Sequence, residues 1–131
     1  MWPFKIAPKA RSKIGEKEFI LLVSPDLWYC EKFTSDVTAS VNMTVLDVRM
    51  AEKLLEKAQK MAQEHSENNI NSLMKATGYN SGFQLSSIDV SEENGKRLIG
   101  LDYTNETFGG DMGWDFIYDE DGAFIEIQAG D

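Results

Sequence analysis

The 131-residue sequence contains one cysteine, one histidine and three prolines. Because Cys30 is the only cysteine, an intrachain disulfide and a cysteine-based zinc site are both excluded. Its neighbours Trp28 and Tyr29 predict a packed thiol, since a nucleophilic cysteine normally needs a histidine base. The lone histidine, His65, falls near the predicted end of a helix, where the helix dipole favours an imidazole. We therefore expect no catalytic cysteine or histidine, no metal and no cofactor.

Long hydrophobic runs are also missing. The longest covers residues 19–23, far short of the roughly 20 apolar residues that a membrane helix requires. The N-terminal residues lack the apolar stretch of a secretory signal. With 42% apolar and 27% charged residues, the composition is that of one globular domain. These features predict a single cytoplasmic domain, 1–131, without a membrane partner.

Basic residues become scarce along the chain. The first 65 residues carry ten basic and nine acidic side chains, whereas the remaining 66 carry three and thirteen. Between Leu101 and Asp131 there is no Lys or Arg at all. Nucleic-acid binding needs clustered basic residues, and the only cluster is Lys5, Lys9, Arg11 and Lys13. Nucleic acid is therefore an unfavourable partner, and the acidic C-terminal third favours water, a cation or a basic protein.

The first half of the chain predicts strands followed by helix. Residues 1–15 contain two prolines and form an N-terminal arm, although Trp2, Phe4 and Ile6 alternate as in an edge strand. Strands are predicted over 17–24 and, from strict alternation of apolar and polar residues, over 37–45.

Two helices follow in the prediction. Asp47 is the expected N-cap of a long amphipathic helix. Its apolar face comprises Ala51, Leu54, Leu55, Ala58, Met61 and Ala62. Ser66 is expected to cap a second, short helix that ends at Gly78.

Two hairpins complete the predicted fold. Strands 83–90 and 96–103 flank Asn94-Gly95, and strands 114–118 and 123–128 flank Asp121-Gly122. A Gly-rich loop, 104–113, joins the two hairpins. The sequence therefore predicts an α+β fold, with a mostly antiparallel sheet, a C-terminal four-strand meander, and one long and one short helix on one face.

The acidic turn of the second hairpin can be compared with a calcium-binding loop. Asp119-Glu120-Asp121-Gly122 offers a fragment of a calcium loop but lacks its length and its terminal glutamate. A hairpin turn explains the same residues without an ion, so we predict no metal there.

A pair of carboxylates gives an alternative, enzymatic interpretation. Asp111 and Asp115 flank Trp114, and an aromatic ring beside two acids can bind a sugar. Glycoside hydrolysis needs two such carboxylates, one with a raised pKa. A small hydrolase acting on a sugar-like substrate is therefore the alternative hypothesis, with Asp111 and Asp115 as the catalytic acids.

The leading hypothesis is a non-catalytic binding surface. Charge attracts a basic protein over long range, and aromatic side chains supply contact area. Alternation along 114–118 also favours a simpler interpretation, in which acids are solvated and aromatics fill the core. The predicted partner-binding residues are Phe108, Asp111, Trp114, Asp115, Asp119, Glu120 and Asp121. Pairing of an exposed strand edge with a second copy is a third possibility.

The C-terminal pattern resembles small bacterial α+β immunity proteins of polymorphic toxins and related families of unknown function. The resemblance lies in Phe108-Gly109-Gly110-Asp111, in the strand 114–118, in Asp119-Glu120-Asp121-Gly122 and in the terminal strand 124–130. It covers roughly the last fifty residues. Such a resemblance implies a non-enzymatic protein that neutralises a toxin, and an acidic inhibitor of a basic nuclease would agree with the charge.

Overall fold

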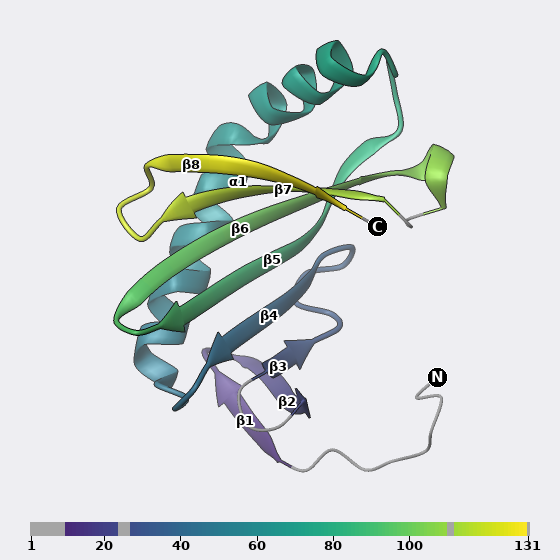
Figure 1. Cartoon of the computed structure of the whole chain (residues 1–131). Helices are drawn as coiled ribbons and strands as arrows, with labels where there is room; N and C mark the ends of the chain where they lie inside the picture. The colour runs from purple at the N-terminus through teal and green to yellow at the C-terminus, as the bar shows by residue number, and fades with distance from the viewer. Residues whose placement is uncertain (1–9, 24–26, 110–111, 131) are drawn as a thin grey trace.

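Eight strands and one long helix form the fold in the computed structural model, which describes residues 10–23, 27–109 and 112–130 (Figure 1). The first four strands precede the helix and the last four follow it. In chain order, the elements are β1 (Arg11–Ile14), β2 (Lys17–Val23), β3 (Leu27–Cys30), β4 (Thr38–Met43), α1 (Val48–Thr77), β5 (Phe83–Glu93), β6 (Lys96–Asn105), a 3-10 turn (Glu106–Phe108), β7 (Gly113–Asp119) and β8 (Phe124–Gly130).

All eight strands belong to one sheet, in which they lie in the order of the chain. Neighbouring strands are antiparallel except β4 and β5, which are parallel because α1 carries the chain back across the sheet. The predicted α+β class and mostly antiparallel sheet are confirmed. The parallel pair at the centre and the short strand β3 were not predicted.

The structure has one continuous helix of 30 residues where the sequence predicted two. Its N-cap is Asp47 as predicted, with Oδ1 accepting a hydrogen bond from the Met50 backbone N–H at 3.1 Å. Its C-cap is Gly78 at φ 81°, a left-handed conformation that suits glycine. The predicted break at Ser66 is absent, because its hydroxyl lies 2.9 Å from the Tyr103 hydroxyl and caps nothing. His65 consequently lies inside the helix, where its ring stacks on Tyr118, and not at a helix end.

The core lies between α1 and the sheet. Alternate residues of the strands point toward the helix, and the helix contributes the apolar stripe that its period predicts. Fully buried members of this core include Phe19, Ala39, Val41, Leu55, Ile88, Ile99, Leu101 and Tyr103. Cys30 is buried in the same layer. The side of the sheet away from α1, here called the open face, carries none of the described helix (Figure 1).

Part of the predicted N-terminal arm is a strand. Residues 11–14 form β1, which pairs with β2 at one edge of the sheet. Residues 1–9 lie outside the described residues. The opposite edge is β8, which among the described residues pairs only with β7.

The helix covers the sheet unevenly. α1 packs mainly on β5 and less on β6 and β1, and its last turns extend past the β8 edge (Figure 1). All seven residues of β8 are exposed, whereas β7 alternates between buried and half-buried positions.

Candidate functional site

The residues predicted to bind a partner are spread over different parts of the molecule. Trp114 is buried on the helix side of β7, where its ring packs against Phe83 and Phe108 with ring centroids 5.4 and 6.2 Å away. Phe108 also meets Tyr79 edge to face. These aromatics close one end of the core. Asp111 lies outside the described residues.

The acidic turn between β7 and β8 has the geometry of a structural turn. The Asp119 carboxylate accepts hydrogen bonds from the backbone N–H groups of Asp121 and Ala123, each at 2.9 Å. Gly122 has φ 91°, which favours glycine. The turn is stabilised by its own carboxylate, as an Asx-type turn is.

Some of the acidic charge is neutralised locally. Glu120 forms an ion pair with Arg97 of β6 at 3.2 Å, and Arg97 also pairs with Glu92 at 2.6 Å. Exposed Asp121 shares a small hollow with Lys57 and Lys60 of α1. Bases from outside the C-terminal third therefore reduce the field at this turn.

Asp115 lies on the open face, opposite the aromatic side chains of β7. The register places it directly across from Asp102 of β6, and each carboxylate lies over a glycine of the neighbouring strand. A β-carbon at Gly100 would be 2.7 Å from Asp115 Oδ1, and one at Gly113 would be 2.9 Å from Asp102 Oδ1. The two glycines therefore make the room that the two carboxylates occupy.

Two acids on this face, Asp102 and Asp115, carry raised pKa values. Burial, and then the charges of Asp89 and Asp102, raise the pKa of Asp115 to about 7. Burial and the charge of Asp89 raise the pKa of Asp102 to about 6. Asp115 Oδ1 is shielded from solvent and has no hydrogen-bond partner among the described residues. Near neutral pH, Asp115 is thus divided between its acid and its anion.

Asp89 of β5 completes this group of acids and differs from the other two in its hydrogen bonds. Its Oδ1 accepts from the hydroxyls of Ser40 at 2.5 Å and Ser87 at 3.1 Å. Sequence analysis did not connect Asp89, Asp102 and Asp115. Their common face depends on how the strands pair, and the only signal was that Gly100 and Asp102 alternate with the apolar residues of β6.

A second feature lies along β8, at the edge of the sheet. Phe124, Ile125 and Ile127 are 55%, 43% and 43% exposed, which is high for such large apolar side chains. A groove of about 370 Å³ separates this strand from α1. It is lined by His65, Asn69, Ser72, Phe116, Tyr118, Gly122, Phe124 and Ile127.

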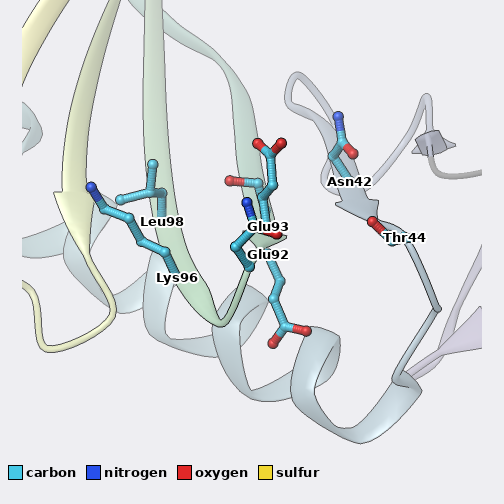
Figure 2. Close-up of a pocket in the computed structure, with 8 residues that line it drawn as sticks. Asn42, Thr44, Glu92, Glu93, Lys96 and Leu98 are labelled. Carbon is cyan, nitrogen blue, oxygen red and sulfur yellow. The ribbon is translucent and has the colours of Figure 1, made fainter.

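A hollow of about 710 Å³ lies on the open face, at the turn between β5 and β6. Figure 2 shows Glu92, Glu93, Lys96 and Leu98 around this turn, with Asn42 on the side of β4. Its lining is polar and mixed in charge, and neither Asp102 nor Asp115 belongs to it. The hollow therefore lacks the carboxylates whose pKa values are perturbed.

Within 10–23, 27–109 and 112–130, no group of three or more histidine, cysteine or carboxylate side chains is arranged to hold a metal ion. No helix of this part of the chain is long and apolar enough to cross a membrane. Comparison with protein-family models, curated proteins and solved structures found no match.

Proposed function

We propose that this chain is a protein-binding domain whose β8 edge pairs with an extended, basic segment of a partner protein. The observation that carries this proposal is an edge strand, β8, which pairs on one side only within the part of the chain that the structure describes. It is exposed over its whole length and rich in large apolar side chains. Such an edge offers a row of free backbone donors and acceptors, and strand addition is a common way to use it. Natural sheets usually protect an exposed edge with lysine, proline or a covering element.

β8 has little of this protection. Its sequence, Phe-Ile-Glu-Ile-Gln-Ala-Gly, contains no lysine, no proline and one charged residue, Glu126. The adjoining turn adds Asp119 and exposed Asp121. The edge therefore combines apolar contact area with negative charge, which favours a segment that alternates apolar with basic residues. Neutralisation of a basic toxin, the role implied by the resemblance to immunity proteins, is one function that such an edge can perform.

A synthetic peptide of alternating lysine and valine tests this proposal directly. It should bind the chain at low salt and bind less as salt screens the charges. Glu126→Lys should weaken binding by about tenfold, since it replaces attraction with repulsion. Glu31→Lys makes the same charge change at another exposed position and is the matched control. Equal loss of binding in both variants would show that only overall charge matters and would contradict a site at β8.

A peptide of alternating glutamate and valine provides the second control. It has the same strand propensity and opposite charge, so it should not bind. Binding of both peptides with equal affinity would contradict the proposed preference for a basic segment.

The hydrolase alternative retains one supporting observation, the raised pKa of Asp115. Asp111 lies outside the described residues. The carboxylate directly across from Asp115 in the sheet is that of Asp102. A general acid with a pKa near 7 is suited to catalysis at neutral pH. Turnover of chromogenic glycosides that is lost in Asp115→Asn would support this second function. Absence of turnover in the unmodified chain would reject it.

A further inference from the structure

We propose that two copies of this chain pair through their β8 strands about a two-fold axis, with Ile127 of one copy directly across from Ile127 of the other. This inference rests on the proposed function, because the second copy occupies the same edge strand. The sheets of the two copies would join into one continuous sheet, and each copy would cover the edge of the other until a basic segment displaces it.

The length of β8 sets the register of this pairing. β8 runs from Phe124 to Gly130, so Ile127 is its central residue. In an antiparallel pair with two-fold symmetry, one residue lies across from its own copy, and residues equally far from it on either side lie across from each other. Centring the pair on Ile127 matches all seven residues of β8, whereas any other centre within the strand leaves residues at its ends unmatched.

The polar side chains of β8 are complementary in this register. Gln128 is paired with Asp115 of β7 and lies on the open face, and Glu126, two positions earlier, points the same way. Within one copy, Gln128 Nε2 donates to Glu126 Oε2 at 3.5 Å. Across the two-fold axis, Glu126 of each copy would lie opposite Gln128 of the other, so each carboxylate would meet an amide donor. Centring the pair on Glu126 would instead place two carboxylates opposite each other, which is unfavourable.

The apolar side chain at the centre of β8 points to the other face. Ile127 is paired with the buried Phe116 and is itself 43% exposed. It lines the groove of about 370 Å³ together with His65 and Ser72 of α1. In the dimer, the two Ile127 side chains would contact each other at the axis and remove apolar surface from water. Removal of apolar surface from water favours association.

The net charge of the chain predicts how salt affects this dimer. Each copy has a formal net charge of −9, so two copies repel each other and salt should strengthen the dimer by screening the repulsion. Binding of the lysine–valine peptide should weaken with salt, because there salt screens an attraction. A contact confined to one short strand should also be reversible and weak at low salt, which leaves the edge free for a basic segment.

Cysteine cross-linking of the full chain tests the register. Ile127→Cys should form a disulfide-linked dimer under oxidising conditions, because residues directly across an antiparallel pair have Cα atoms about 4.5–5.5 Å apart, within disulfide range. Ile125→Cys is the matched control, since Ile125 has the same 43% exposure but would lie across from Ala129. It should cross-link at least about tenfold less. Cys30 is buried, so its thiol does not compete. Equal cross-linking of the two variants, or more in Ile125→Cys, overturns the proposal.

Sedimentation velocity tests the association without an added thiol. The unmodified chain should dimerise reversibly, and more strongly at high salt. Gln128→Glu should weaken the dimer by about tenfold, because it places carboxylates opposite each other at two symmetric positions. Gln63→Glu makes the same change at an exposed position of α1 and should have little effect. An unmodified chain that is monomeric at high salt up to about millimolar concentration overturns the proposal, as does equal weakening by the two variants.

The lysine–valine peptide separates failure of this inference from failure of the proposed function. If both are correct, the peptide binds the chain and dissociates the dimer. If the chain is monomeric and still binds the peptide, the edge function stands and the self-pairing is wrong. If the chain forms the Ile127-centred dimer and does not bind the peptide, the self-pairing stands and the preference for a basic segment is wrong. If it neither dimerises nor binds the peptide, both proposals fail.

Discussion

β7 and β8 are adjacent strands of equal length and similar apolar content, but their side chains have different surroundings. β7 places Trp114, Phe116 and Tyr118 in the core, each less than 9% exposed. β8 leaves Phe124 and Ile127 at 55% and 43% exposure. The two strands differ in position, since β7 lies between β6 and β8, whereas β8 is an edge of the described sheet. The apolar side chains of β7 therefore stabilise the core, whereas those of β8 remain exposed and can contact a partner protein.

The largest expected effect is a difference in stability between substitutions in β7 and in β8. Phe116→Ala should lower the free energy of unfolding by about 3 kcal/mol or more, because it opens a cavity beside Tyr103. Phe124→Ala, at the exposed neighbour, should cost less than about 1 kcal/mol. Chemical denaturation of both variants measures the difference. Equal losses would show that β8 is part of the core.

The two faces of β7 should respond oppositely to substitution. Asp115→Asn should raise the free energy of unfolding at about pH 8 by roughly 1–2 kcal/mol, after allowance for partial exposure. The folded state, with the pKa of Asp115 at about 7, holds its proton to higher pH than the unfolded chain does. Stability from this group therefore falls as pH rises from about 4 through 7, and at about pH 4 the substitution should change little. Denaturation at both pH values checks this sign; destabilisation at the higher pH would contradict it.

A smaller effect is expected from the hydroxyl of Tyr118. Asn69 is buried and donates through Nδ2 to Tyr118 at 3.0 Å and to Tyr103 at 3.1 Å. Tyr118→Phe removes one of these acceptors, so we expect a loss of about 1 kcal/mol in unfolding free energy. Thermal denaturation beside Tyr79→Phe, at an exposed tyrosine, supplies the comparison. An equal loss of stability in both variants would show that the hydrogen bond from the buried Asn69 amide to Tyr118 contributes nothing.

The smallest expected effect is at the edge itself. Ile127→Asp should lower the free energy of unfolding by about 1 kcal/mol or less, because its side chain is already partly in water and the change costs mainly strand propensity. Val45→Asp should behave similarly in the same denaturation experiment. A large loss in Ile127→Asp alone would show that β8 packs more tightly than its exposure indicates.

Local patterns predicted most strand positions and the helix start. Alternation identified β4 and β7, and Asn94-Gly95 located the turn between β5 and β6, where Asn94 has positive φ. Asp47 was identified as the cap from its position before the apolar stripe. These features depend on a few neighbouring residues, so one sequence is enough to find them.

Features that depend on tertiary contacts were not predicted. Ser66 has the chemistry of a cap, but in the structure its hydroxyl meets Tyr103 from another element and the helix continues. The sequence paired Asp115 with Asp111, its neighbour along the chain, whereas the sheet pairs it with Asp102 across two strands. The exposure of β8 accompanies its place at the edge of the described sheet, which no local pattern records.

Amide hydrogen exchange tests the central claim, that β8 is an open edge able to accept a basic extended segment. The experiment compares the chain with and without the lysine–valine peptide. We expect exchange in β8 to slow by at least about tenfold on peptide addition, while β1, the basic edge, is unchanged. Protection that appears at β1 instead, or at neither edge, would contradict the account.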